Sequence, residues 1–407
     1  MIMFKSWARR TLAGRNVGPE VLQKKNFLAN VFILDDEMKH KKANLLEYQG
    51  ITEENDIQYS DANIDACKLD VLYNKELLGK YIEGKYPILF NIHGGGWIAG
   101  DKLYRRGFCM QFANEGFFVV NINYGLSPMS LFPEPFRHIN YAMNWVYDNA
   151  EKYNLDLDNF FITGDSAGGH LASMAIAIEK SAEYREKLGI EEPKVKIKKA
   201  ILNSAVLYPN KVMFLPIMDM MIKSFVPIKN RKEFETAYDY KDYVSFVKAL
   251  DVDFPEIMFV TATQDFATRA QNKAVIKTCK EKGLKFRQFD NNAFMNRFHC
   301  FHLKIWMPGA NRAQKESIRF LLESLTDSEE TLKGILTYKE YRARYKLEKK
   351  YLSKLELIEA LPDCPDRTAM INSLNSTYQA KKSKLLAKQA KQHEKYEKTR
   401  LKRFPHI

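Results

Sequence analysis

Residues 159–169 read NFFITGDSAGG, an apolar run followed by a serine between glycines. The run is typical of a buried strand, and from Leu171 to Ile178 apolar residues recur every three or four positions, as on one face of a helix. A G-x-S-x-G sequence between a strand and a helix is the context of a nucleophile elbow, a turn so sharp that only hydrogen fits beside the backbone. We therefore predict that Ser166 is a nucleophile, with the positive end of the following helix directed at it.

Similar apolar runs alternate with helical patterns from about Cys67 to Leu325. The runs are nearly continuous, as in parallel strands that are covered on both faces. We expect core strands at residues 87–92, 117–122, 159–163, 200–204 and 257–263. The pattern predicts an α/β fold, with a mostly parallel central sheet flanked by helices.

A second motif, HGGGW at residues 93–97, follows the predicted strand 87–92. Consecutive glycines let the backbone turn so that its N–H groups point at a substrate. A phosphate-binding loop is the alternative, but no lysine follows in P-loop register. The two motifs at strand ends together predict an oxyanion hole next to an activated serine.

An activated serine needs a histidine base and an acid that orients the histidine, in the chain order serine, acid, histidine. Asp265 follows the predicted strand 257–263 and precedes a helix, so its carboxylate is expected at the carboxyl edge of the sheet. Asp251, Asp253 and Asp290 lack that position and are expected in turns or at the surface.

Four histidines follow this acid, and two of them, His393 and His406, lie in a polar tail. His299 and His302 share a loop before the last predicted helix of the domain, and the residue pattern does not separate them. Three of the four histidines before Asp265 are expected to have structural roles, the first two by hydrogen-bonding loops around the site: His93, His138 and His170.

Together, HGGGW and GDSAGG closely resemble the hormone-sensitive-lipase-like branch of the α/β-hydrolases. The similarity extends from about Cys67 to Leu325 and includes YGLSP at residues 124–128. It implies an α/β-hydrolase fold and carboxylesterase activity that needs no metal or organic cofactor. The family's base stands in a His-Gly-Phe segment, which HCF at residues 299–301 matches and His302 does not. The resemblance therefore implies His299 as the base.

The resemblance also implies that the backbone amides of Gly95, Gly96 and Ala167 form the oxyanion hole. This chain departs from the family pattern at four places. Cys300 replaces the glycine after the base, and Phe266 rather than proline follows the acid. Two further residues replace the usual Arg and Glu: Gly125 and Met129. These departures bear on the loops around the base and on substrate preference.

The chain of 407 residues divides into three predicted regions. Residues 1–66 form an N-terminal segment, residues 67–326 a catalytic domain with an insertion at about 208–250, and residues 327–407 a basic helical tail. In the family, the N-terminal residues and the segment after the sixth strand often build a cap, so residues 1–66 and 208–250 are expected to form it. Four residues of the insertion are candidates for an acyl pocket, although a Met-rich stripe is more typical of core packing: Met213, Phe214, Met218 and Met221.

The function expected from this site is a serine carboxylesterase that hydrolyses small or short-acyl esters through an acyl-enzyme. An amidase or formamidase would use the same residues. A receptor without catalytic activity is a third alternative, because plant gibberellin receptors resemble this family and lack the histidine. The complete set of Ser166, Asp265 and His299 favours an enzyme.

The net charge of +13 raises the question of an anionic partner. Residues 327–407 contain 19 Lys and Arg and 11 Asp and Glu, a net charge of +8 that leaves +5 for the rest. Capping-box spacing at Thr326 and Glu329, with Pro362 and Pro365, predicts a hairpin of two helices, the second over about 367–403. Because glutamates interleave with the lysines and aromatic residues are few, we expect a solvated tail rather than a surface for nucleic acid or an anionic membrane.

Five cysteines are scattered and never spaced as C-x-x-C, so neither a disulfide framework nor a zinc site is expected. No apolar run approaches the roughly 18 residues that span a bilayer, and residues 1–20 lack a signal-peptide core. These features predict a soluble, cytoplasmic protein that acts on a small-molecule ester. They leave the oligomeric state open.

Overall fold

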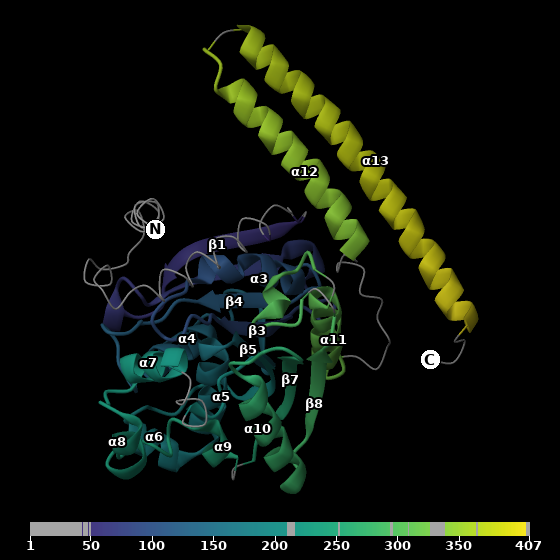
Figure 1. Ribbon diagram of the computed structural model, residues 1–407. Helices are drawn as coiled ribbons and strands as arrows, with labels where there is room; N and C mark the ends of the chain where they lie inside the picture. Colours follow the sequence, from purple (N-terminus) through teal and green to yellow (C-terminus); the bar gives the residue numbers. More distant parts are fainter. Residues whose placement is uncertain are drawn as a thin grey trace.

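The computed structural model describes residues 43, 48, 50–209, 216–250, 253–293, 296–307, 309–325, 338–363 and 365–403 (Figure 1). Within these residues one sheet contains the strands β1 (Ile51–Gln58), β2 (Lys68–Asn74), β3 (Tyr86–Ile92), β4 (Phe118–Ile122), β5 (Leu155–Asp165), β6 (Ile197–Asn203), β7 (Glu256–Ala262) and β8 (Phe286–Asn291). The α-helices are α3 (Arg106–Ala113), α4 (Glu134–Asp148), α5 (Ala167–Lys180), α6 (Ala182–Leu188), α7 (Pro216–Phe225), α8 (Arg231–Thr236), α9 (Phe246–Ala249), α10 (Arg269–Glu281), α11 (Ala310–Leu322), α12 (Tyr338–Glu359) and α13 (Pro365–Arg403). Short 3-10 helices are η3 (Asp61–Asn63), η4 (Lys75–Leu77), η5 (Lys102–Arg105) and η7 (Phe301–Leu303).

The strand order across the sheet is β1-β2-β4-β3-β5-β6-β7-β8. From β4 to β8 all neighbours are parallel, whereas β2 is antiparallel to both β1 and β4. Parallel neighbours need crossover connections, and helices supply them here. Because parallel strands end at one edge, the segments after β3, β5, β7 and β8 meet there. The sheet confirms the predicted α/β-hydrolase fold.

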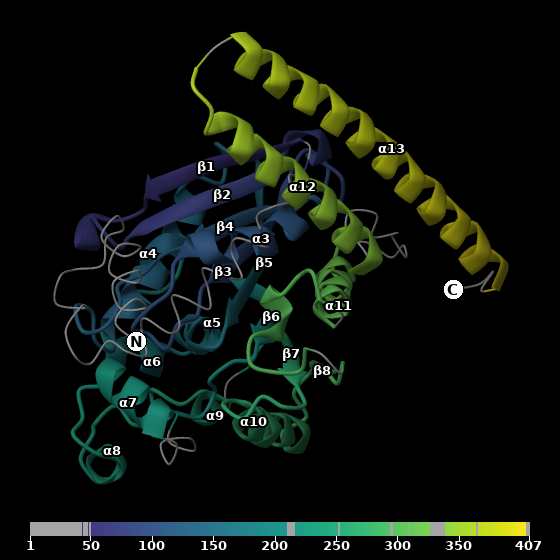
Figure 2. The same cartoon turned by 45° about the horizontal axis from the view of Figure 1, so that its top comes forward.

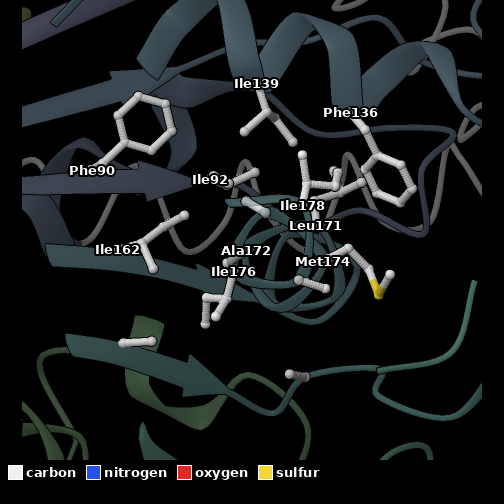
Figure 3. Packing of buried hydrophobic residues seen from close by; sticks show 14 of the residues in the cluster. Phe90, Ile92, Phe136, Ile139, Ile162, Leu171, Ala172, Met174, Ile176 and Ile178 are labelled. Carbon is white, nitrogen blue, oxygen red and sulfur yellow. The ribbon is translucent and has the colours of Figure 1, made fainter. Parts of the chain in front are cut away.

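Successive residues of the central strands pack into two different cores. In β3, Leu89 joins side chains of α3 and α11, whereas Phe90 and Ile92 join those of α4 and α5 on the other face. Figure 3 shows this second core, with Ile139 of α4 and Leu171 of α5 among the residues around the strands. Burial on both faces explains why the strands are continuously apolar in the sequence.

The sheet begins earlier in the chain than the predicted catalytic domain. Residues 51–58, which the sequence places in the N-terminal cap, form β1 and pair with β2. β1 reads ITEENDIQ and is at least partly exposed throughout, so it lacks both the apolar run and the alternation that identify a strand. Most of the segment before β1 lies outside the described residues, and a cap formed by it stays a prediction.

Helices α12 and α13 lie side by side as a hairpin that projects from the body of the molecule, as Figures 1 and 2 both show. Tyr351 of α12 stacks on Tyr378 of α13, and Arg344 donates a hydrogen bond to Gln389. The second helix predicted over about 367–403 corresponds to α13. Within the part of the chain that is described, no helix has both the length and the apolar character to cross a membrane.

Candidate active site

Ser166 lies between β5 and α5, with φ 52° and ψ −116°. A positive φ is costly for a residue with a side chain and persists only where the surrounding structure enforces it. The turn is enforced by close packing. A Cβ on Gly164 would lie 2.4 Å from the carbonyl oxygen of Gly168, and a Cβ on Gly168 would lie 2.2 Å from that of Ile92. The strand-to-helix turn thus has the geometry of a nucleophile elbow.

The ring of His299 lies between Ser166 and Asp265. Its Nε2 is 2.9 Å from Oγ of Ser166, and its Nδ1 is 2.9 Å from Oδ2 of Asp265. Because an ionised carboxylate can only accept, Nδ1–H donates to Asp265. When the ring is neutral, Nε2 is left to accept the hydrogen of the Ser166 hydroxyl. Burial lowers the pKa of His299, but Cys300 and the Asp265 carboxylate raise it more, so the pKa lies well above its usual value.

The carboxylate of Asp265 is held by its own turn. It accepts hydrogen bonds from the backbone N–H groups of Ala267 and Thr268, at 3.1 and 3.0 Å, and from the Thr268 hydroxyl at 2.6 Å. Burial raises the pKa of Asp265, but His299 and these hydrogen bonds lower it by more, so that it is about 2. Asp265 is therefore ionised at neutral pH and can orient the imidazole.

The other residues considered for the acid and the base are not placed at Ser166. The buried ring of His302 packs edge-on against Phe108 and Phe301. Asp290 accepts hydrogen bonds from Thr261 and Arg269, so it belongs to the edge of β7 and β8. Asp253 is exposed, and Asp251 lies outside the described residues. Of the residues considered from the sequence, the structure brings Asp265 and His299 to Ser166.

His93, His138 and His170 contact backbone groups around the site. Nδ1 of His93 lies 2.9 Å from a carbonyl of its own turn, and Nδ1 of His138 accepts from the N–H of Gly125 at 3.0 Å. Nε2 of His170 lies 2.7 Å from a carbonyl just before α9. Burial lowers the pKa of all three rings, that of His170 to about 4. These contacts agree with the expected structural roles.

The glycine turn after β3 lies next to the elbow. The N–H of Gly94 donates to Oδ1 of Asp165 at 3.1 Å, which joins the two turns. Gly95 and Gly96 have φ values of 136° and 62°, which side chains rarely adopt. Ala167 is the first residue of α5, where a backbone N–H has no acceptor within the helix. The three predicted oxyanion-hole residues thus lie on two joined turns at one sheet edge.

Helix α7 of the insertion packs on the glycine turn. A Cβ on Gly96 would lie 2.4 Å from Sδ of Met221, and the ring of Phe225 stacks on Trp97 with centroids 4.9 Å apart. Met218 and Met221 are both buried. The other two candidates for an acyl pocket, Met213 and Phe214, lie outside the described residues.

A buried ion pair next to Ser166 is absent from the sequence-based prediction. Nε and Nη2 of Arg105 donate to Oδ1 and Oδ2 of Asp165 at 2.8 and 2.7 Å. Burial raises the pKa of Asp165, but the charge and hydrogen bonds of Arg105 lower it more, so it lies well below its usual value. The signal available in the sequence was Asp165 itself, inside the motif. Arg105 stands in no motif, and only the fold brings it to the elbow.

Cys300 occupies the place of the family's glycine in a left-handed conformation, with φ 52°. Its N–H donates to Oγ of Ser204 at 3.3 Å, and its Sγ lies 3.6 Å from Oδ2 of Asp165. The residue that follows His299 is therefore in contact with the residue that precedes Ser166. A thiol here links the loop of the base to the elbow.

The site contains a serine hydroxyl within hydrogen-bonding distance of an imidazole, and that imidazole is hydrogen-bonded to an ionised carboxylate. This set of groups suits nucleophilic attack on a carbonyl carbon. Within the described part of the chain, no group of three or more His, Cys, Asp or Glu side chains is arranged to hold a metal ion.

Known proteins match the part of the chain that contains these turns. The family model BD-FAE matches residues 76–209. Arylacetamide deacetylase from Rattus norvegicus is 34% identical over 179 residues, which are 40% of this chain and 39% of that protein. An esterase from Gibberella moniliformis is 27% identical over 208 residues, which are 49% of this chain and 61% of that protein. The chain spans about two fifths of the length of other curated relatives, 38–41% for three of them.

Solved structures share the fold over a larger part of the chain. Esterase B from Lactobacillus rhamnosis, solved with a tributyrin phosphonate, has a TM-score of 0.63 and 21% identity over 79% of this chain and 95% of its own. Bacterial heroin esterase has a TM-score of 0.59 and 18% identity over 79% of this chain and 97% of its own. At these identities the likeness shows the common fold.

Proposed function

We propose that the chain is a serine carboxylesterase for small or short-acyl esters, an α/β-hydrolase of the hormone-sensitive-lipase-like branch, as the similarity to BD-FAE and to esterases supports. The observation that carries the proposal is the pair of contacts made by His299. One ring nitrogen lies 2.9 Å from the Ser166 hydroxyl and the other lies 2.9 Å from the Asp265 carboxylate. A hydroxyl in this setting can lose its proton as it attacks.

In the proposed reaction, Oγ of Ser166 attacks the ester carbonyl carbon while Nε2 of His299 takes the hydroxyl proton. The tetrahedral intermediate collapses as the imidazolium returns that proton to the departing alcohol, which leaves an acyl ester on Ser166. A water molecule then attacks the acyl carbon, and His299 moves its proton to Ser166 Oγ as the acid leaves. Asp265 keeps the ring in the required tautomer and stabilises the imidazolium.

The amides of Gly95, Gly96 and Ala167 are proposed to stabilise the oxyanion. Two of them stand on backbone that glycine alone adopts readily, and the third starts a helix whose dipole favours negative charge. Loss of one such donor typically costs about a hundredfold or more in kcat. The hydrogen bond from Gly94 to Asp165 supports the proposal because it fixes the glycine turn against the elbow.

A short-acyl range is supported by the packing of α7. Met221 lies on Gly96, at the turn that would face the acyl carbonyl. In addition, esterase B, which shares the fold, was solved with a phosphonate related to tributyrin, a four-carbon acyl ester. The preference is tested by kcat/KM for p-nitrophenyl esters of increasing acyl length. We expect acetate and butyrate to be turned over much faster than laurate.

Amide hydrolysis is the second candidate function, because one relative carries the name arylacetamide deacetylase. The same serine, base and oxyanion hole would serve an anilide, but His299 would have to protonate an amine. Parallel assays on p-nitroacetanilide and formanilide separate the two activities. A kcat/KM for an anilide that exceeds the value for the matching ester would make the amidase the main function.

The decisive experiment compares the wild type with Ser166→Ala and His299→Ala. A phosphonate ester should label the wild type once per chain, and mass spectrometry should place the label on Ser166. Both variants should lose the label and nearly all turnover of p-nitrophenyl acetate, while circular dichroism shows an unchanged fold. Wild-type turnover no higher than that of Ser166→Ala on short esters and anilides alike would favour a receptor without catalysis.

A further inference from the structure

The positive charge of the tail is concentrated in one part of α13. Residues 327–367 contain nine Lys and Arg and nine Asp and Glu, so their net charge is zero. Residues 368–380 carry no charged side chain, and residues 381–403 contain ten Lys and Arg and two Glu. A net charge of +8, out of +13 for the whole chain, therefore lies on 23 residues of one helix.

Four lysines of this stretch form a line along the helix, which we call the lysine row: Lys381, Lys384, Lys388 and Lys391. Spacings of three and four residues place them on one face, with about 5 Å of helix rise between neighbours. Lys395, Lys398 and Lys402 continue the same spacing toward the end of α13. Residues 367–393 contain no Asp or Glu, so the row itself is not neutralised along its own helix.

The lysine row does not take part in the contact between α12 and α13. That contact is made by another face of α13, where Tyr378 stacks on Tyr351, and Lys382 lies 3.8 Å from Glu348. All four lysines of the row are exposed. The hairpin projects from the body of the molecule (Figures 1 and 2). Adjacent lysines of the sequence thus have different positions: Lys382 faces α12, and the row faces solvent.

The neighbours of the row decide which kind of anion fits. Ala380 and Ala387 are exposed beside it, and Leu385 and Leu386 are half-buried. A helix that lies in a membrane interface needs a face of large apolar side chains, and a helical protein partner needs an apolar seam. Binding of single-stranded nucleic acid uses aromatic stacking, yet residues 381–391 contain no aromatic side chain. Binding to the backbone of a duplex requires only cations that can reach the phosphates, and small side chains beside the lysines leave them free to do so.

The sequence-based expectation of a solvated tail rested on glutamates among the lysines, but these glutamates, Glu394 and Glu397, lie beyond the lysine row. Against that expectation, we propose that the lysine row of α13 binds the phosphate backbone of double-stranded nucleic acid without sequence preference. Each lysine neutralises phosphate charge and releases counterions, so binding is strong at low salt and weakens steeply as salt is added. Duplex DNA and duplex RNA present the same chemistry to such a row. This inference concerns a surface apart from the catalytic turns and does not depend on the esterase proposal.

The test is fluorescence anisotropy of the full chain with a labelled duplex of about two helical turns, as DNA and as RNA, at about 50 to 200 mM KCl. One variant removes the row: Lys381→Gln, Lys384→Gln, Lys388→Gln and Lys391→Gln. A matched control removes four exposed lysines of α12 from the same hairpin: Lys346→Gln, Lys349→Gln, Lys350→Gln and Lys354→Gln. The two variants have the same net charge.

Loss of the row should raise the Kd at least about tenfold and reduce the slope of log K against log salt by about 3.6, because four phosphate contacts are lost. The control should change the Kd less than about threefold, and a Lys→Arg version of the row should bind like the wild type. Equal weakening by row and control variants would overturn the proposal in favour of diffuse charge. Absence of wild-type binding to either duplex, or row-dependent binding to phosphatidylserine vesicles alone, would also overturn it. Turnover of p-nitrophenyl butyrate and helix content confirm that each variant is folded.

Discussion

The guanidinium of Arg105 and the carboxylate of Asp165 form a buried bidentate ion pair, with N–O distances of 2.8 and 2.7 Å. The same carboxylate accepts from the N–H of Gly94 and lies 3.6 Å from Sγ of Cys300. One buried acid therefore connects the glycine turn, the elbow and the loop of His299. The positions of all three turns depend on it.

Asp165→Asn should destabilise the fold, because it leaves the buried guanidinium of Arg105 without this carboxylate. Breaking a buried ion pair from one side costs about 3 kcal/mol or more. The double variant Arg105→Met with Asp165→Asn should recover most of that loss, since no charge stays buried. Urea unfolding of both single variants and the double variant completes the cycle.

A surface pair serves as the control for this cycle. Arg319 and Glu316 are 2.7 Å apart on α11, with both side chains about half exposed. Glu316→Gln should change the free energy of unfolding by less than about 1 kcal/mol. If Asp165→Asn cost no more than Glu316→Gln, the buried pair would have no special part in holding the turns.

Cys300→Ala should be less stable than Cys300→Gly. Both variants lose the sulfur contact with Asp165, but alanine keeps a Cβ at φ 52°, a conformation that glycine adopts without strain. A left-handed conformation costs a residue with a side chain about 1 kcal/mol or more. The midpoints of thermal unfolding should therefore rank glycine above alanine. Equal midpoints would show that the backbone turn relaxes when the thiol is removed.

The thiol contact itself is tested by Cys300→Ser, which keeps a donor at the same place. This variant should retain more kcat/KM for p-nitrophenyl acetate than Cys300→Ala does, because an O–H can still reach Asp165. A serine variant as slow as the alanine variant would show that the volume of sulfur, and not its hydrogen, matters.

The sheet and the serine turn were predictable because each depends on local sequence. Continuous apolar runs identify strands that are covered on both faces. Glycine is required at 164 and 168 because a Cβ there would lie 2.4 Å or less from a backbone carbonyl oxygen. β1 was missed because an edge strand that is exposed along its length needs no apolar pattern. Its place is fixed by pairing with β2, the next strand along the chain.

The base and the ion pair show the limit of reasoning from residue types. His299 and His302 share one loop, and only the course of that loop decides that one ring lies by Ser166 while the other packs on Phe108. The family resemblance supplied the choice that the residues alone left open. Arg105 lies 60 positions before Asp165 in the chain, so their pairing follows from the tertiary structure alone.

The pH dependence of activity should reflect the environment of His299. The base must be neutral to accept the proton, and its pKa is raised above the usual 6.5. We expect kcat/KM for p-nitrophenyl acetate to rise with pH through an apparent pKa above 6.5. Asp265→Asn removes a charge that raises this pKa, so the rise should move to lower pH, and kcat should fall by up to about 10⁴-fold. An unshifted profile in Asp265→Asn would contradict the assignment of the acid.

Stability in acid should depend on Asp265. Its pKa is lowered from 3.8 to about 2 in the folded protein, so the folded state binds its proton less readily than the unfolded chain does. The stabilisation is therefore complete above pH 3.8 and is lost as the pH falls toward 2. For a shift of this size it amounts to about 2 kcal/mol. His299 is protonated throughout this range, so the ion pair that lowers the pKa persists until Asp265 itself takes up a proton.

The free energy of unfolding, measured in urea between about pH 5 and pH 2, should fall less steeply for Asp265→Asn than for the wild type. Parallel slopes would mean that other carboxyl groups account for the acid sensitivity and that Asp265 has an ordinary pKa.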